Sequence, residues 1–199
     1  TGLRPALIDL DPQGSSTRWL ANRPASLASI IGTEGFQNSL QVTKTWHLRT
    51  PENSDLAVID TPAGLTRQEL ISATRGADAI LIPVMPSDID IHAVMKCISD
   101  LLLVAKIPRP DMKIGIIANR VRANTRVYGQ LKKFLSSLDI PVVATLRDSQ
   151  NYTRAFEFGM GIHEMPFSQV KKDIDAWSDI MGWLDRLRER NLGQPSAIH

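Results

Sequence analysis

Residues 7–17 read LIDLDPQGSST: a short apolar run that ends in two aspartates, a proline and a glycine, followed by hydroxyl residues. Residues 56–64 read LAVIDTPAG and repeat this arrangement, with one aspartate at the end of the run and a turn that closes on glycine. Runs that are apolar on both faces and end in turn-forming residues are typical of buried parallel strands. The two stretches therefore predict two strands of a parallel sheet.

Short apolar runs alternate with longer helical patterns along the chain, which is typical of strands joined by helical crossovers. The predicted strands are residues 6–10, 56–59, 79–84, 113–118 and, less clearly, 141–145. The predicted helices are residues 16–22, 67–75, 91–105, 126–138, 152–158 and 170–190. Residues 24–50 are expected to be irregular, with one short extra strand near Trp46. The predicted fold class is therefore α/β, with a mostly parallel sheet flanked by helices.

The composition indicates one compact domain. With 199 residues, 43% of them hydrophobic and 22% charged, the chain can bury one core and is too short for two comfortable domains. We expect a single domain over residues 1–190 and a frayed tail over residues 191–199. The single cysteine, Cys97, excludes an internal disulfide and suggests a reducing compartment. The apolar stretches end before the roughly 18 to 20 residues of a membrane span, so a soluble, cytoplasmic protein is expected.

Polar residues gather where the predicted strands end. They are Asp9 and Asp11 after the first strand, Asp60, Thr61, Pro62 and Gly64 after the second, and Asn119 and Arg120 after the fourth. In an open parallel sheet the ligand site forms at the carboxyl ends of the strands. Carboxylates can hold the waters of Mg²⁺, a glycine amide can approach a phosphate, and a carboxamide can pair with a purine edge. Each residue alone is better explained as a turn former or helix cap, whereas the set together favours a magnesium-nucleotide site.

Four segments, LIDLDPQGSST, LAVIDTPAG, ILIPVMPSDID and IIANR, resemble successive motifs of the ParA and MinD family of deviant P-loop ATPases. The resemblance spans nearly the whole chain, and the pairing of LIDLDPQG with VIDTPAG at this separation is highly specific. It implies a three-layer P-loop NTPase fold of the SIMIBI type. It also implies that Asp11 orients or activates the attacking water, that Asp9 supports the magnesium shell, and that Asp60 reaches Mg²⁺ through water.

The same resemblance implies roles for the turns that follow. Thr61 and Pro62 belong to the switch in which the backbone amide of Gly64 senses the γ-phosphate. Asn119 recognises adenine, with Arg120 beside it, while Arg147 lies in the turn that closes the base pocket. The implied cofactors are ATP or ADP with Mg²⁺, and the intact family member is an ATP hydrolase.

One feature departs from the family: no glycine-rich, lysine-bearing phosphate loop is present in these residues. The opening residues 1–5, TGLRP, resemble the end of the family's first helix, so we expect a strand, loop and helix of roughly 30 residues upstream. Without that strand, residues 56–59 are expected to lack a neighbour in the sheet. We hypothesise that the natural protein has an intact phosphate loop, and the rival hypothesis is a true pseudo-ATPase.

The net charge is only +2, but basic residues gather in the later third of the chain. The resemblance implies that an ATP-bound homodimer binds DNA without sequence preference through such residues, by salt-sensitive phosphate contacts. The candidates are Arg122, Arg126, Arg147 and Arg154. Solvated helix faces are the alternative interpretation, because acids such as Asp139 and Asp148 are interspersed.

The resemblance therefore predicts a nucleoid-associated ATPase that positions a plasmid, chromosome or protein cargo and responds to a ParB-like stimulating partner. A non-hydrolysing adaptor of the same fold is one alternative. A MinD-like, membrane-associated positioning ATPase is another, but the apolar stripe of the last helix is more simply a face that docks on the core, so no membrane contact is expected. An amidase or reductase relative of the same nucleotide fold would need a characteristic cysteine or set of metal ligands, and the sequence lacks the ones expected of such a relative.

Overall fold

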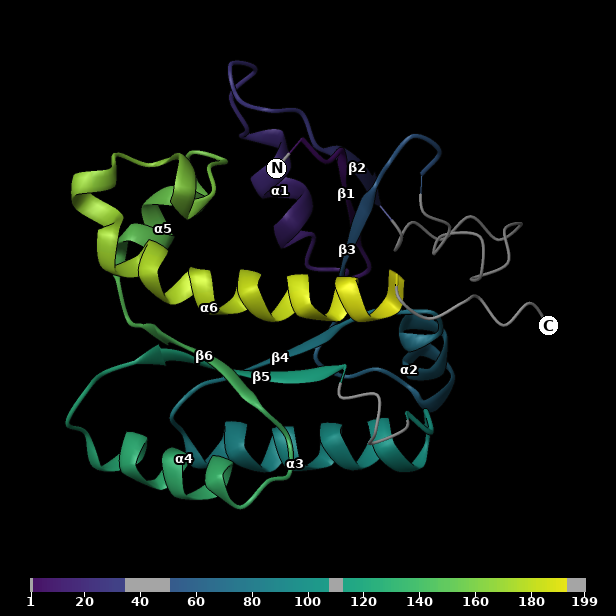
Figure 1. Ribbon diagram of the computed structural model, residues 1–199, viewed down its shortest axis with the longest axis vertical. Coiled ribbons are helices and arrows are strands. Elements are labelled where there is room, and N and C mark those ends of the chain that lie inside the picture. Colours follow the sequence, from purple (N-terminus) through teal and green to yellow (C-terminus); the bar gives the residue numbers. More distant parts are fainter. Residues whose placement is uncertain (1, 35–50, 108–112, 193–199) are drawn as a thin grey trace. The chain divides into compact units, whose positions relative to one another are not determined.

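The computed structural model describes residues 2–34, 51–107 and 113–192, and these divide into two compact units (Figure 1). The first unit comprises Thr1–Arg75 and Asn151–Met165, and the second comprises Gly76–Gln150 and Pro166–His199. Each unit contains its own parallel sheet. The expectation of one domain over residues 1–190 stays a prediction.

The first unit is built on a three-stranded parallel sheet with the order β2-β1-β3. Its strands are β1 (Pro5–Asp9), β2 (Ile31–Glu34) and β3 (Leu56–Asp60). Its helices are α1 (Ser15–Ala21), α2 (Arg67–Thr74), most of α5 (Gln150–Glu157) and the 3₁₀ turn η3 (Ile162–Glu164). Ala6 and Ile8 of the central strand β1 are buried, so the core of this unit lies on β1.

Strand β3 differs from the prediction of a strand that is buried on both faces. Among the described strands it pairs with β1 alone and lies at an edge of its sheet, which agrees with the expectation that residues 56–59 lack a neighbour. Leu56 is 48% exposed and Val58 is 52% exposed. An edge strand has packing partners on one side only, which is why the apolar pattern of these residues overstated their burial.

Strand β2 lies in a region that we expected to be irregular. Residues 31–34 read IGTE, too short and too poor in apolar residues to be recognised from periodicity. Gly32 leaves room for Leu20 of α1, because an added Cβ atom would come within 2.2 Å of Cδ2 of Leu20 and the leucine side chain would have to move. The extra strand expected near Trp46 lies outside the described residues.

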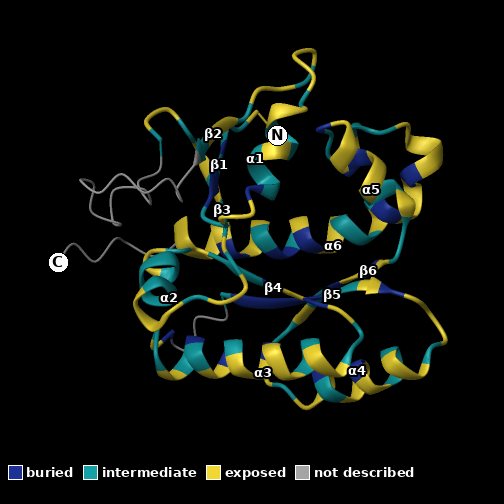
Figure 2. Cartoon of the chain, turned by 180° about the vertical axis from the view of Figure 1, so that it is seen from behind, coloured by how far each residue is buried: buried dark blue, intermediate teal, exposed yellow. Residues whose placement is uncertain are grey.

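The second unit has three layers. Its parallel sheet has the order β4-β5-β6, formed by β4 (Ile80–Val84), β5 (Ile114–Val121) and β6 (Val142–Arg147). Helices α3 (Asp88–Leu103) and α4 (Arg126–Ser136) cover one face of the sheet, and α6 (Phe167–Leu192) covers the other (Figure 1). The central strand β5 is buried along most of its length (Figure 2), which confirms the prediction for residues 113–118.

The core between the sheet and α6 contains Ile117, Ala144, Leu146 and Ile180. Trp177 and Leu184 of α6 pack against this cluster, so the apolar stripe of the last helix is a core-docking face as predicted. Helix α6 continues to Leu192, slightly beyond the predicted end at residue 190. The tail from residue 193 onward lies outside the described residues.

The helix starts follow from local sequence. The Ser87 hydroxyl accepts a hydrogen bond from the backbone amide of Asp90, at 3.1 Å, so Ser87 is the N-cap of α3. Thr66 caps α2 and forms a reciprocal capping box with Glu69. These caps fix the helix starts that follow the carboxyl ends of β3 and β4.

Candidate functional site

The acids of the first unit meet at the carboxyl ends of β1 and β3. The parallel register places Asp9 opposite Asp60. Both strands end there, and α1 begins only a few residues after β1, so its first turn faces both acids. The structure therefore brings together Asp9, Asp11 and Asp60, as the sequence predicts.

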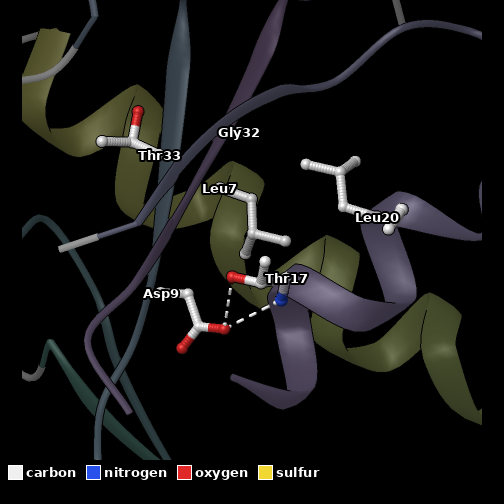
Figure 3. A pocket seen from close by; sticks show the side chains of 7 residues that line it. Leu7, Asp9, Thr17, Leu20, Gly32 and Thr33 are labelled. Carbon is white, nitrogen blue, oxygen red and sulfur yellow. Dashed lines mark hydrogen bonds between the residues drawn. The ribbon is translucent and has the colours of Figure 1, made fainter. Parts of the chain in front are cut away.

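Asp9 is almost completely buried, with 1% of its surface exposed, and its carboxylate is occupied by protein donors (Figure 3). Oδ1 accepts a hydrogen bond from the backbone amide of Asp11, at 3.1 Å. Oδ2 accepts two bonds from Thr17, one from its backbone amide at 2.8 Å and one from its hydroxyl at 2.9 Å. The predicted metal-shell and catalytic roles of Asp9 stay predictions, because these contacts give it a positioning role.

Helix α1 explains why this acid is needed. Its N-cap is Gly14, in a left-handed conformation with φ 62°, and Gly14 supplies no side-chain cap. Glycine adopts this conformation without strain. The first amides of a helix need acceptors from elsewhere, and Asp9 on the neighbouring strand provides one.

Asp11 shapes the turn between β1 and α1. Its Oδ1 accepts a hydrogen bond from the Gln13 amide at 2.9 Å, and its carbonyl accepts one from the Gly14 amide at 2.8 Å. The residue is half-buried. Its carboxylate is thus held on the turn that joins β1 to α1, where water has access.

Asp60 ends β3 and is half-buried. Its Oδ2 accepts a hydrogen bond from the Ser16 hydroxyl at 2.6 Å, and its carbonyl accepts one from the Leu10 amide at 2.8 Å. Thr61, Pro62 and Gly64 follow directly in an irregular turn. Gly64 is exposed, with nothing within 4 Å of an added Cβ, so its amide is approachable as the predicted switch requires.

A hollow of about 260 Å³ lies beside these acids, between α1 and strands β1 and β2 (Figure 3). Its lining is Leu7, Asp9, Thr17, Leu20, Ala21, Gly32 and Thr33. The lining is mainly apolar and carries no basic side chain, and it does not include Asp11, Asp60 or Gly64. The hollow is therefore not suited to a triphosphate.

The residues predicted for base recognition lie in the second unit, at the carboxyl end of β5. The register of β5 with β6 shifts between Ala118 and Val121, so Asn119 and Arg120 form a bulge. Arg120 has φ 49°, in the left-handed region, and the Asn119 Oδ1 accepts a hydrogen bond from its amide at 2.9 Å. Bulges and left-handed non-glycine residues are common next to functional sites.

Two arginines share one carboxylate beside this bulge. Arg122 Nε donates to Asp148 at 2.8 Å, and Arg120 Nε lies 3.4 Å from the same carboxylate. The hydrogen bond from Arg122 is the main cause that lowers the pKa of Asp148 below its ordinary value. Both guanidinium groups are largely exposed, so a ligand can still reach them.

Arg147 has a different environment from the one the sequence predicts. Its Nε and Nη2 donate to the two oxygens of Asp173 at 2.7 and 2.8 Å, which joins the end of β6 to α6. Asp173 is fully buried. The predicted roles of Arg147 in base and DNA binding stay predictions, and the contact itself is structural.

The remaining DNA-binding candidates are exposed. Arg126 begins α4 in the second unit, and Arg154 lies on α5 in the first unit. Asn119, Arg120, Arg122, Arg126 and Arg147 belong to the second unit, and the three acids belong to the first. Asp9, Asp60, Asn119 and Arg120 lie at the carboxyl ends of strands, as expected, whereas Arg154 lies within helix α5.

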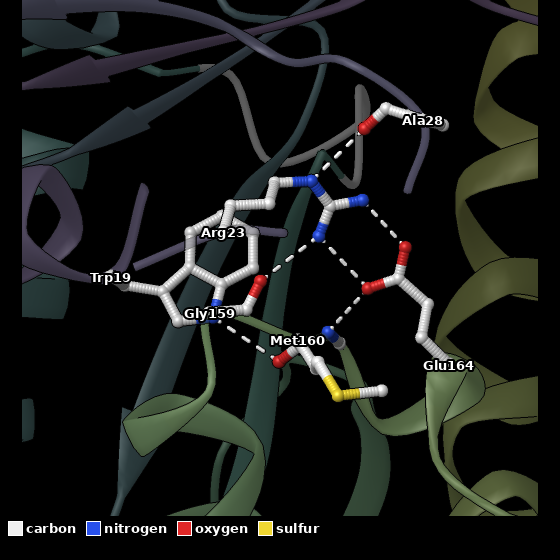
Figure 4. Close-up of polar contacts among 7 residues, drawn as sticks. Trp19, Arg23, Ala28, Gly159, Met160 and Glu164 are labelled. Carbon is white, nitrogen blue, oxygen red and sulfur yellow. Dashed lines mark hydrogen bonds and ion pairs between the residues drawn. The ribbon is translucent and has the colours of Figure 1, made fainter. Parts of the chain in front are cut away.

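Sequence reasoning missed a polar cluster that holds the end of α1 (Figure 4). Arg23 is paired with Glu164, Nη2 to Oε1 at 2.5 Å, and its side chain is 8% exposed. Arg23 Nη1 also donates to the Gly159 carbonyl, and Trp19 Nε1 donates to the Met160 carbonyl, both at 3.1 Å. These partners lie more than 130 residues apart in the chain, so no local pattern signals them.

The chemistry of the first unit suits magnesium held mainly through water. The described residues contain no group of three or more His, Cys, Asp or Glu side chains able to hold a metal ion. Mg²⁺ usually keeps several waters and binds through one or two carboxylates together with substrate phosphates. A half-buried Asp60 beside a hydroxyl fits that mode, whereas a histidine or thiolate metal would not find ligands here.

Comparison with known proteins agrees with this geometry. Residues 1–162 match the family model described as the CobQ/CobB/MinD/ParA nucleotide binding domain. The maintenance of carboxysome distribution protein A of Halothiobacillus neapolitanus is 26% identical over 165 residues, which is 81% of this chain and 74% of that protein. The protein of the same name from Gloeobacter kilaueensis is 28% identical over 95 residues, or 48% of this chain and 42% of that protein.

Solved structures share the fold. A plasmid partition protein of Borrelia burgdorferi bound to AMPPNP has a TM-score of 0.64 and 14% identity, with 91% of this chain and 87% of that chain covered. MinD of Pyrococcus horikoshii with Mg-ADP has a TM-score of 0.63 and 16% identity, with coverage of 94% and 85%. McdA of Cyanothece with ATP has a TM-score of 0.61 and 18% identity, with coverage of 100% and 88%.

The predicted P-loop NTPase fold, with parallel sheets flanked by helices, is thereby confirmed. None of the helices described in the structure has the length and apolarity needed to cross a bilayer. The match to the family model covers most of the chain, and the acids at the ends of β1 and β3 lie within it. The chain belongs to the ParA/MinD family of deviant P-loop ATPases, within the CobQ/CobB/MinD/ParA nucleotide-binding domains.

Proposed function

We propose that this protein is a ParA-type positioning ATPase that binds ATP with Mg²⁺, forms a homodimer, binds DNA without sequence preference and moves a large cargo. The observation that carries the proposal is the pairing of Asp9 with Asp60 at the carboxyl ends of β1 and β3, with Asp11 on the turn that follows β1. This is the edge of a parallel sheet at which ligands bind. The relatives of known structure with bound nucleotide support the choice of ATP and ADP.

Each acid has a distinct proposed role. Asp11, on the turn after β1, orients and deprotonates the attacking water, since its half-buried carboxylate is accessible to solvent. Asp60 accepts hydrogen bonds from magnesium-bound water, and Asp9 supports that shell from behind by holding the turn and α1. When bound, Mg²⁺ neutralises charge that develops on the phosphates.

The turn after Asp60 is the proposed nucleotide switch. The exposed amide of Gly64 is available to the terminal phosphate, with Thr61 and Pro62 shaping the turn. In the second unit, Asn119 and Arg120 on the β5 bulge are the proposed adenine contacts, and Arg147 stays a candidate for the wall of that pocket.

DNA binding is assigned to the exposed guanidinium groups of Arg122, Arg126 and Arg154, with Arg147 as the weakest candidate because of its bond to buried Asp173. From this assignment we infer that the protein is cytoplasmic and associates with the nucleoid. A ParB-like partner is proposed to stimulate hydrolysis. Two relatives are named for carboxysome distribution. The proposed cargo is therefore a plasmid, a chromosome or a protein assembly.

The decisive experiment measures ATP hydrolysis by the whole gene product, with and without DNA. Because no lysine-bearing, glycine-rich loop occurs in these 199 residues, a non-hydrolysing adaptor is the competing function. We expect DNA-stimulated hydrolysis that Asp11→Ala abolishes while ATP binding remains. Nucleotide binding without hydrolysis in the unaltered protein would favour the adaptor, and no nucleotide binding at all would refute the proposal.

A further inference from the structure

Two consecutive residues on the first turn of α1 bind the two strand-terminal acids. Thr17 donates from its amide and hydroxyl to Asp9, and the Ser16 hydroxyl donates to Asp60 at 2.6 Å. The α1 turn therefore connects β1 and β3 through side chains, in addition to the hydrogen bonds between the strands.

The two acids differ in how much acceptor capacity they retain. Asp9 is buried, and its oxygens accept three hydrogen bonds from the protein. Asp60 is half-buried, and among the residues that the structure describes only Ser16 donates to its Oδ2. Within residues 2–34, 51–107 and 113–192, nothing donates a hydrogen bond to Oδ1 of Asp60. Of these two acids, Asp60 is the one with an oxygen left for a further donor.

The hydrogen bond from Ser16 to Asp60 belongs to the strong, charge-assisted class. A hydroxyl that donates to an ionised carboxylate lies at 2.5 to 2.7 Å, and such bonds are roughly twice as strong as neutral ones. An aspartate carboxylate without such a partner samples several rotamers, and fixing it at the moment of binding costs conformational entropy. A donor already in place removes that cost in advance.

We propose that Ser16 is a positioning residue that holds the Asp60 carboxylate by Oδ2 and thereby keeps Oδ1 ready to accept from magnesium-bound water. This inference rests on the proposed function, since it concerns the magnesium dependence of nucleotide binding at the same site. Ser16 acts through Asp60 and touches neither nucleotide nor metal.

The chain offers matched variants for the test. Ser16→Ala removes the hydroxyl, and Ser16→Thr keeps a hydroxyl on the same β-carbon. Ser15→Ala is the control, because the Ser15 hydroxyl is also on the first turn of α1 but accepts from Arg18, at 3.1 Å, with no acid as partner. The three variants separate the bond to Asp60 from general effects on this helix.

The experiment titrates Mg²⁺ into the whole gene product with a fluorescent ATP analogue and records the magnesium concentration at half-maximal binding. We expect Ser16→Ala to raise that concentration roughly three- to tenfold, the range expected from losing one hydrogen bond to a charged group, while Ser15→Ala and Ser16→Thr stay within about twofold of the unaltered protein. Binding of the analogue in EDTA should be the same for all four proteins.

Five outcomes overturn the inference. An unchanged magnesium dependence in Ser16→Ala, with normal binding by the unaltered protein, refutes it alone. An equal loss in Ser16→Thr shows that the hydroxyl is not the relevant group. An equal loss of affinity in EDTA, or a lowered thermal unfolding midpoint, shows a structural role. Absence of magnesium-dependent nucleotide binding in the unaltered protein refutes the proposed function as well.

Discussion

Arg147 donates two hydrogen bonds to Asp173, at 2.7 Å from Nε and 2.8 Å from Nη2, and Asp173 is fully buried. The pair joins the end of β6 to the first turns of α6. Because a buried carboxylate needs compensation for its lost hydration, this arginine stabilises the second unit regardless of any ligand. Charge reversal at Arg147 is therefore a poor test of DNA binding.

Replacing Arg147 is expected to destabilise the protein. Arg147→Ala removes both bonds to buried Asp173 and should lower the free energy of unfolding by about 2–4 kcal/mol, measured by urea denaturation. Arg147→Lys retains the charge but not the two-pronged geometry, and should recover only part of that loss. An Arg147→Ala protein as stable as the unaltered one would show that the pair contributes nothing.

The ion pair of Arg23 and Glu164 predicts a pH-dependent stability. Hydrogen bonding to Arg23 lowers the pKa of Glu164 below its ordinary value of 4.5. A carboxyl with a lowered pKa in the folded state stabilises that state above its unfolded pKa, and this contribution disappears as the pH falls through the folded pKa. The pair should therefore stabilise the protein at neutral pH and not in strong acid.

Glu164→Gln tests this dependence. At pH 7 it should reduce the free energy of unfolding by about 1–2 kcal/mol, because a charge-assisted bond becomes a neutral one. As the pH falls below the ordinary glutamate value of 4.5 and through the lowered pKa of folded Glu164, the difference between the two proteins should shrink. Urea denaturation of both proteins across this range gives the comparison, and a constant difference would exclude the ion pair as its source.

Two glycines make a matched pair for backbone effects. Gly159 has φ 61°, and an added Cβ would lie 2.3 Å from the backbone nitrogen of Arg23. Gly159→Ala should therefore cost about 2 kcal/mol or more. Gly129 lies inside α4 with nothing within 4 Å of an added Cβ, so Gly129→Ala should stabilise by about 0.5–1 kcal/mol. Thermal unfolding distinguishes the two signs.

Arg126 is the cleanest candidate for a phosphate contact, because it is exposed at the start of α4. Arg126→Ala should weaken DNA binding of the ATP-bound protein for all sequences and reduce the slope of log K against log[salt] by about 0.9, one phosphate contact. The control is Arg188→Ala on α6, an exposed arginine outside the candidate set. Equal slopes for Arg126→Ala and the unaltered protein in fluorescence anisotropy would remove Arg126 from the interface.

Much of the fold was predictable because its elements carry local signals. The strand at 114–121 is a continuous β-rich run in a parallel sheet, and Ser87 caps α3 as its position before an apolar helix indicates. Strand β2 was not predictable, since IGTE has little apolar character and is placed by its pairing with β1 and by the fit of Gly32 against α1.

The candidate site was predictable at the level of strand ends and not at the level of side-chain partners. The positions of Asp9 and Asp60 follow from the rule that parallel strands present their carboxyl ends at one edge. The bonds of Ser16 to Asp60 and of Arg147 to Asp173 depend on tertiary packing across 44 and 26 residues, which no local pattern records. From sequence alone, the hydroxyl residues after DPQG could equally be residues that begin a helix or hydrogen-bond donors to a distant acid.

The capping of α1 by Asp9 affects how loss-of-function variants should be interpreted. Loss of the proposed ATP hydrolysis after Asp9→Ala would ordinarily be taken as proof that Asp9 takes part in the chemistry, yet here the same loss follows if α1 is no longer anchored. Activity alone is thus uninformative at this position. Hydrogen exchange at the Thr17 amide would report directly on whether the anchor has been released.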